Sequence, residues 1–289
     1  MDGWIVYKEA DIEKNRVFIN YLIVAAVACG MTAILMVRER LTLGVEHNAL
    51  ALFYDGARVV TLPNFSVNRC ADALLSKQME GMGIRVFNNA SVCEVCNDKA
   101  LTHQVVSSTG VKQLDTVFLT RNEFDLARVP FAYPFVAKPA QGSGGRDVCL
   151  IENREDLIGF VQRMADESFL LQRLAEMVGK DLRVFVVGDA IIGAILRTSR
   201  TDFRANYTLG GAFEPYSLSK KETQTVRKLM RMFDFDMVGM DFLFDRNHDL
   251  VFNEIEDAVG SRTLYQATNL NLADIFMKHV YITLTKGFN

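Results

Sequence analysis

The stretch Val238–Thr263, VGMDFLFDRNHDLVFNEIEDAVGSRT, decides how the rest of the chain is interpreted. Two β-rich runs in it flank the turn-forming cluster Asp-Arg-Asn-His-Asp, which predicts a two-stranded hairpin. Side chains alternate along a strand, so Glu254 and Glu256 point to the same face. Asp241 stands among Phe, Leu, Met and Gly on the other strand. The predicted hairpin therefore carries three carboxylates in otherwise apolar strands.

These three acidic side chains have two explanations. Charged groups are rarely buried without a partner. Hard divalent metals prefer oxygen ligands, so Asp241, Glu254 and Glu256 are candidate metal ligands. A polar sheet edge with solvated acids explains the same pattern, because charged residues are common on edge strands. The hairpin alone leaves both interpretations open.

Composition limits the class of protein. The chain has 289 residues, 49% of them hydrophobic, which is typical of two or more globular domains. The net charge is −3 with acids and bases well mixed, so we expect no nucleic-acid partner. There are five cysteines, an odd number, and no signal-peptide pattern, which leads us to expect a reducing cytoplasm.

The apolar run Val17–Val37 is long enough to imitate a membrane span. Gly30 divides it, however, into a buried helix over Glu13–Cys29 and a core strand over Thr32–Val37. A strand at Trp4–Tyr7 precedes the helix, so the whole segment is typical of a βαβ unit. We therefore expect no membrane association. Oligomeric state stays open, with a homo-oligomer as one alternative because this first domain is so apolar.

Three regions follow one another along the chain. Residues 1–97 alternate strands and helices, which predicts a small parallel α/β domain. Residues 98–168 hold a helix, a β-rich stretch and a glycine loop. Residues 169–289 are mostly strands, with helices predicted over Lys220–Phe233 and Leu272–Leu284. The remaining predicted strands are Ile84–Phe87, Phe169–Gln172, Leu182–Val187 and Ala190–Leu196, and a further helix is predicted over Ala71–Met82.

A glycine loop between two strands occupies Phe135–Ile151, FVAKPAQGSGGRDVCLI. It is neither a Walker loop nor GxGxxG. Glycines let backbone N–H groups approach an anion, and Lys138 would add a positive charge just before the loop. Lys99 opens the predicted helix Lys99–Ser107. A flexible hairpin tip and two solvated lysines are the alternative.

Further polar residues are ambiguous in isolation. Gln172–Leu174 ends an apolar strand and could offer backbone groups to a base edge. Arg183 and Arg197 are charges in otherwise apolar strands. Arg204 and Asn206 share strand parity, so both could reach one anion from an extended segment. Plain strand ends and a surface loop explain the same residues.

The order of these residues is more specific than any one of them. The chain resembles the ATP-grasp superfamily, most closely the RimK-type ligases and more distantly glutathione synthetase. The most specific segments are GKDLRVFVVG (Gly179–Gly188), DFRAN (Asp202–Asn206) followed by Gly210 and Gly211, and Gly239–Asp241. The resemblance covers nearly the whole chain. It implies an ATP-grasp fold, in which an N-terminal parallel α/β domain precedes two α+β subdomains that grip ATP.

The resemblance also implies roles at a nucleotide site. Lys99 and Lys138 correspond to the lysines that hold ATP phosphates, and Asp181 corresponds to a nucleotide contact. The other implied nucleotide-binding positions are the loop residues Gln141, Gly142, Ser143 and Gly144, the hinge residues Gln172, Arg173 and Leu174, and Arg204 and Asn206 near the phosphates.

Catalytic and metal-binding roles follow from the same resemblance. Arg197 and Arg204 correspond to basic residues that stabilise charge at the reacting groups. Asp241, Glu254 and Glu256 correspond to the ligands of two Mg²⁺ ions, with Mn²⁺ as an alternative. No protein nucleophile is expected.

Two positions depart from the family pattern. Glu256 stands where relatives have Asn; a carboxylate still binds hard metals, so we keep its metal role. Arg173 stands where the hinge has Glu; only backbone groups are essential there, but a side-chain contact of that Glu is in doubt.

The implied activity is ATP-dependent ligation of a carboxylate to an amine through an acyl-phosphate, on a small-molecule or peptide substrate. A small-molecule kinase of the same fold and a non-catalytic nucleotide-binding regulatory protein are the alternatives. Arg262, just after the hairpin, either holds a substrate carboxylate or caps the following helical turn.

Overall fold

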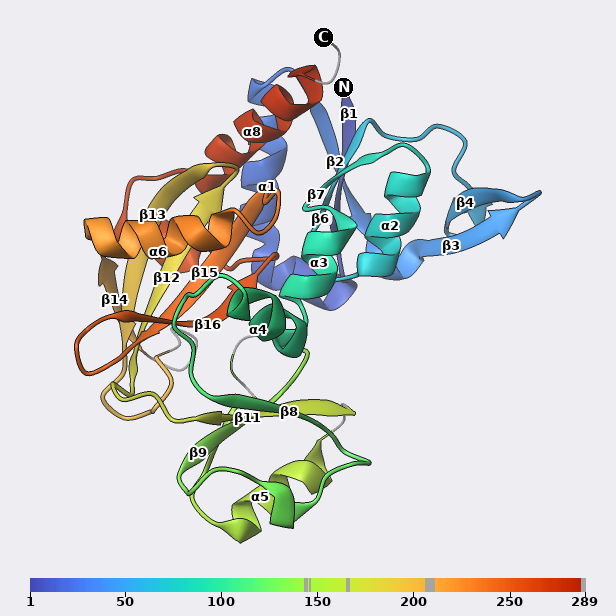
Figure 1. The fold of residues 1–289 in the computed structure, drawn as a ribbon. Coiled ribbons are helices and arrows are strands. Elements are labelled where there is room, and N and C mark those ends of the chain that lie inside the picture. The colour runs from blue at the N-terminus through green and yellow to red at the C-terminus, as the bar shows by residue number, and fades with distance from the viewer. Residues whose placement is uncertain (143–144, 146, 165–166, 206–210, 287–289) are drawn as a thin grey trace.

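The computed structural model describes residues 1–142, 145, 147–164, 167–205 and 211–286. Its N-terminal part is a parallel sheet of four strands in the order β2-β1-β6-β7 (Figure 1). The bounds are β1 (Asp2–Tyr7), α1 (Glu9–Ala28), β2 (Thr32–Val37), β6 (Phe65–Asn68), α2 (Ala73–Gly81) and β7 (Arg85–Phe87). The predicted parallel α/β architecture is confirmed. Ile5 and Tyr7 on β1 face the cluster that contains α1, whereas Trp4 and Val6 face α2.

Strand β6 and a small antiparallel sheet were not predicted. The second sheet contains β3 (Leu41–Glu46), β4 (Ala49–Tyr54) and β5 (Ala57–Arg58), and it projects from the body in Figure 1. Strand β6 is short and half polar, so it lacks a strong β pattern. Its Ser66 and Asn68 are nevertheless buried, because Ser66 Oγ donates to Asn68 Oδ1 and the Asn68 amide donates to Ser76 Oγ.

The apolar run Val17–Val37 forms a helix and a strand, as predicted. Gly30 separates them with a φ of 73°, a left-handed conformation that glycine adopts without strain. Helix α1 begins at Glu9, earlier than expected, and it is not fully buried: Val24 and Val27 are 66% and 64% exposed. Among the described residues, no helix is both long and apolar enough to cross a membrane.

The central part is an antiparallel sheet in the order β10-β9-β11-β8 with one helix packed on it (Figure 1). The bounds are β8 (Thr116–Thr120), β9 (Phe135–Pro139), β10 (Cys149–Ile151), α5 (Arg154–Arg163) and β11 (Ser168–Arg173). Strand β11 pairs with both β8 and β9. It therefore completes this sheet, although the sequence pattern placed Phe169–Gln172 with the third region.

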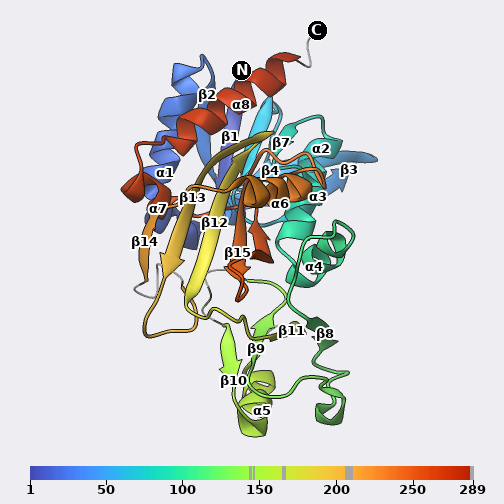
Figure 2. The ribbon, with the colours of Figure 1, turned by 60° about the vertical axis from the view of Figure 1, so that its left-hand side comes forward.

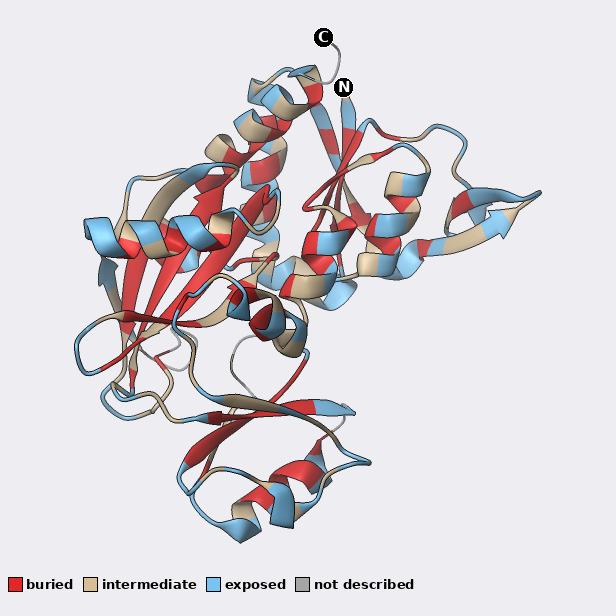
Figure 3. Ribbon diagram, viewed as in Figure 1, coloured by how far each residue is buried: buried red, intermediate tan, exposed pale blue. Residues whose placement is uncertain are grey.

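The C-terminal part is a five-stranded antiparallel sheet in the order β14-β13-β12-β15-β16. Helix α6 packs on one face, and α1 and α8 pack on the other (Figure 2). The bounds are β12 (Lys180–Val187), β13 (Ala190–Thr198), β14 (Ala212–Pro215), α6 (Lys220–Met230), β15 (Met237–Phe244), β16 (Leu250–Glu256), α7 (Arg262–Ala267) and α8 (Leu272–Lys286). The predicted hairpin is β15 and β16, and both strands are largely buried (Figure 3).

Helices α3 (Ala90–Cys96) and α4 (Lys99–Ser107) connect the first sheet to the central one. Just before them, Asn88 is buried and bonds to the start of β15. Its Oδ1 accepts from the backbone N–H groups of Asp236 and Met237 at 2.7 and 3.0 Å. Asp236 also pairs with Arg85 and with His279 of α8. These contacts hold the N-terminal domain against the end of the hairpin that carries the three carboxylates.

Candidate active site

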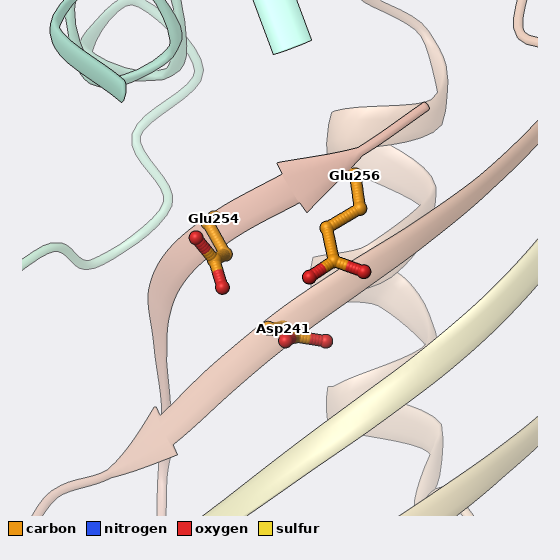
Figure 4. A group of neighbouring side chains, drawn as sticks. All are labelled: Asp241, Glu254 and Glu256. Carbon is orange, nitrogen blue, oxygen red and sulfur yellow. The ribbon is translucent and has the colours of Figure 1, made fainter. Parts of the chain in front are cut away.

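Three carboxylates converge on one face of the β15–β16 hairpin. Asp241 lies directly opposite Glu254 in the strand register, and Glu256 lies opposite Gly239. One oxygen from each carboxylate lies within 4.8 Å of the others, and Figure 4 shows the three groups pointing toward one another. Asp241 is buried and the glutamates are half-buried. The alternation expected from the sequence therefore brings the predicted metal ligands together.

Two arginines provide the counter-charges for Asp241. Arg183 lies directly opposite Asp241 on β12, donating from Nε to Oδ1 at 2.7 Å and from Nη2 to Oδ2 at 2.6 Å. Arg197 Nη2 donates to the same Oδ2 at 2.8 Å. Arg183 also pairs with Glu256 at 2.9 Å. The cations that allow Asp241 to be buried are thus side chains of neighbouring strands.

Arg183 was not assigned a role from the sequence. The sequence does show a lone charge at Arg183 in an apolar strand. It does not show the partner of Arg183, because that partner depends on how β12 pairs with β15. The resemblance singled out Arg197 instead, which lies opposite Asp181 on β12 and donates to its Oδ1 from Nε at 2.5 Å.

Electrostatics separates the two aspartates. Burial by itself would raise the pKa of Asp241, but the charges of Arg183 and Arg197 outweigh burial and hold that pKa at about 2. Burial raises the pKa of Asp181 to about 6, against the opposing effect of Arg197 and with a further rise from the charge of Asp241. Burial also raises the pKa of Glu256. Asp241 is therefore held in its charged form, whereas burial disfavours the charged forms of Asp181 and Glu256.

A cavity adjoins the carboxylates between the central and C-terminal sheets. It is lined by ten of the predicted site residues: Lys99, Lys138, Gln141, Gly142, Gln172, Arg173, Leu174, Asp181, Arg204 and Glu254. Ser143, Gly144 and Asn206, which were also predicted, lie outside the described residues. Because Glu254 belongs both to this lining and to the carboxylate cluster, the two features form one site.

The two predicted lysines lie on the same side of this cavity. Lys99, the first residue of α4, donates to the carbonyl of Gly142 at 2.6 Å and lies 3.8 Å from Glu254. Lys138, on β9, is only 4% exposed. Burial lowers the pKa of Lys138 to about 8, although the nearby charge of Glu254 raises it, and Lys99 lowers it further. Two cations thus face a cavity that could accept an anion.

The side chains of the predicted hinge residues Gln172 and Arg173 have different partners. Gln172 lines the cavity, and its amide donates to Thr116 Oγ1 at 2.9 Å and lies 3.3 Å from His103 Nε2. Arg173 pairs with Asp115, so its side chain is engaged outside the site. His103 was missed. Its signal was its spacing, because it lies one helical turn after Lys99 on α4.

Arg204 contacts the glycine loop directly. Its Nη1 donates to the carbonyls of Gly145 and Val148 at 2.7 and 3.2 Å, while its guanidinium pairs with Asp202. The residue therefore links the segment after β13 to the loop over the cavity. Arg262 is exposed at the start of α7.

Fold and site together define an ATP-grasp protein, with a cavity between two α+β subdomains and an acidic cluster beside it. The RimK-like ATP-grasp domain model matches residues 96–280, so the chain belongs to this family, which comprises carboxylate–amine ligases. Two solved structures share the fold. A RimK domain protein from Sphaerobacter thermophilus has a TM-score of 0.73 and 17% identity, over 96% of this chain and 99% of that one. D-alanine–D-alanine ligase from Bacillus anthracis has a TM-score of 0.73 and 12% identity, over 99% and 98%.

Curated relatives include named ligases. N-acetylaspartylglutamate synthase A from Homo sapiens is 30% identical over 259 residues, which are 86% of this chain and 66% of that enzyme. Glutamate–LysW ligase ArgX from Sulfurisphaera tokodaii is 29% identical over 217 residues, which are 71% and 76% of the two chains. The resemblance seen in the sequence is therefore confirmed at the level of family and fold.

The buried arginine generates a first prediction. Replacing Arg183 with Met leaves buried Asp241 and half-buried Glu256 without their main counter-charge, which typically costs about 3–5 kcal/mol. We expect urea denaturation to show a loss of this size in the free energy of unfolding. Arg173→Met, which removes an exposed pair, is the matched control and should change it by less than about 1 kcal/mol. Equal stability of the two variants would contradict the assignment.

Lys138 generates a second prediction, on pH. Its pKa is lower in the folded chain, so the folded state binds fewer protons than the unfolded state between about pH 8 and 10.5, and stability rises with pH there. Lys138→Met removes a buried charge and should be more stable than the unaltered chain by about 3 kcal/mol at pH 7.

The stability advantage of Lys138→Met should shrink between about pH 8 and 10.5 and vanish at higher pH. Urea unfolding at several pH values would measure it. The exposed Lys278→Met is the control and should show no such pH dependence. An advantage for Lys138→Met that persists unchanged at high pH would show that the charge of Lys138 is not its source.

Proposed function

We propose that the chain is an ATP-dependent ligase that joins a carboxylate to an amine through an acyl-phosphate and releases ADP and phosphate. One observation carries the proposal: Glu254 lies both in the three-carboxylate cluster and in the cavity that holds Lys99 and Lys138. Two lysines that suit phosphates therefore lie near carboxylate oxygens that suit a metal, which supports the proposal. A simple binding pocket requires no such pairing.

The acidic cluster fits a divalent metal such as Mg²⁺. Its three residues offer carboxylate oxygens within 4.8 Å of one another, and hard cations take oxygen ligands. Oδ2 of Asp241 already accepts from both arginines, but Oδ1 accepts only from Arg183 Nε and keeps a second lone pair, so metal coordination remains open to Oδ1. Glu256 supplies a carboxylate in place of the family Asn. Bound metal would neutralise phosphate charge, and we propose Asp241, Glu254 and Glu256 as its ligands.

The cavity suits a nucleotide. Apolar side chains of Leu114, Val136 and Met177 line one part of it and would contact the base, next to the backbone of Leu174. Lys99 and Lys138 also line the cavity and would contact phosphate oxygens. Because Lys99 also donates to the carbonyl of Gly142, a shift of the glycine loop would change the position of Lys99 relative to the phosphates.

The ligation requires two displacements. A carboxylate oxygen of the substrate attacks the γ-phosphorus, and the bond to ADP breaks. The amine nitrogen then attacks the acyl carbon, loses a proton, and phosphate leaves. Lys138, which lines the cavity, would stabilise the charge that develops on the phosphoryl oxygens. Arg197, buried against Asp181 and Asp241, would add positive charge from outside the lining. Arg204 would hold the glycine loop closed, which keeps water from hydrolysing the intermediate.

Carboxylate variants test the assignment of the reaction centre. Asp241→Asn and Glu254→Gln should each lower ADP formation by at least about 100-fold, because each removes charge that faces the reacting phosphates. Coupled-enzyme assays of ADP release would measure the loss. The control is Asp249→Asn in the hairpin turn, where the carboxylate pairs with exposed Lys221 outside the proposed site. Full turnover in both site variants would reject the proposed metal ligands.

The substrate is proposed to be an amino acid or a short peptide. Relatives include a glutamate ligase and an N-acetylaspartylglutamate synthase by name, so glutamate is the first compound to test. Arg262, which is exposed at the start of α7, is our candidate for holding a substrate carboxylate.

A screen of amino acids and peptides with magnesium and ATP should reveal the activity. We expect ADP release together with a product whose mass is the sum of two substrates minus one water. A stable product that gains only a phosphate group would instead indicate a kinase. Metal-dependent ATP binding without turnover on any substrate would indicate a non-catalytic nucleotide-binding protein.

A further inference from the structure

Strand β16 contains a bulge at the edge of the cavity. Asp241 pairs with Glu254, but the next residue of β15, Phe242, pairs with Phe252. Asn253 therefore has no partner across the hairpin. Phe252 and Ile255 point into the hydrophobic core, whereas the consecutive residues Asn253 and Glu254 both line the cavity. A regular strand would have turned Asn253 toward the core, because neighbouring side chains alternate.

The bulge brings Asn253 to the buried lysine. Lys138 Nζ donates to Asn253 Oδ1 at 3.2 Å. Among the described residues, no carboxylate lies within 4.0 Å of the Lys138 ammonium group, and Glu254 lies close to Lys99 instead. A buried ammonium group needs an acceptor, and the side chain of Asn253 provides it.

The choice of an amide is chemically specific. An amide oxygen satisfies one N–H of the ammonium group and leaves the positive charge unneutralised. A carboxylate at the same place would neutralise Lys138 and repel phosphate, and an aliphatic side chain would leave the buried N–H without an acceptor. Only the amide both orients the lysine and preserves its attraction for an anion.

We infer that Asn253 is a positioning residue that holds Lys138 in place for the phosphates of a bound nucleotide. This inference rests on the proposed ATP site. It gives Asn253 an effect that acts through Lys138 and therefore depends on phosphate. A ligand that carries the base and ribose alone should not sense the residue.

Calorimetric titrations with MgATP, MgADP and adenosine test the inference. Asn253→Leu should weaken MgATP and MgADP binding by about 10-fold or more, the effect of losing a hydrogen bond to a charged group. Adenosine affinity should stay within about 2-fold of the unaltered chain. Asn253→Asp should weaken MgATP more than MgADP, because repulsion grows with phosphate charge. Asn247→Leu in the exposed hairpin turn is the matched control and should bind all three ligands normally.

Thermal unfolding should first show that the variants are folded. MgATP affinity that is unchanged in Asn253→Leu would overturn the inference. An equal loss for adenosine and MgATP would also overturn it, because it would show that Asn253 shapes the pocket as a whole. Failure of the unaltered chain to bind MgATP would instead reject the proposed function itself.

Discussion

The site depends on a buried ion pair between two central strands. Arg183 on β12 and Asp241 on β15 face each other directly, and both are almost inaccessible to solvent. Each charge would be strongly unfavourable there alone, so removing either partner destabilises the pairing of these two strands. The same guanidinium reaches Glu256, and Arg197 completes the arrangement. Two positive groups thereby allow a dense set of carboxylates to assemble beside an apolar core.

The N-terminal domain also contributes to this geometry. Asn88 holds the start of β15, and Arg69 Nη2 donates to the carbonyl of Val259 at 2.7 Å, just after the acidic cluster. Arg183 contacts the next carbonyl, that of Gly260. The loop after β16 is thus held from both sides, by Arg69 of the first domain and by Arg183 of β12. A substrate bound at this junction would touch elements from both.

Local patterns predicted much of the fold and of the site. The βαβ start, the glycine loop and the hairpin follow from glycine positions and from alternation, which depend only on neighbours in the chain. Strand β6 was missed because the polar residues Ser66 and Asn68 break its apolar pattern. The strand is nevertheless buried, since these two side chains bond to each other. The membership of β11 in the central sheet was missed as well, since pairing involves residues far apart in sequence. Asn253 was missed for the same reason, because its contact with Lys138 joins residues far apart in sequence.

The sequence by itself determined the residue types of a phosphate and metal site and their order, and these were specific enough to indicate the ATP-grasp family. The tertiary structure alone decided which charges meet. Asp241 pairs with Arg183, which is far from it in the sequence. Arg204 donates hydrogen bonds to the carbonyls of Gly145 and Val148 in the glycine loop. The physical reason is that strand register and bulges set these distances. A one-residue change in either would turn each side chain to the opposite face.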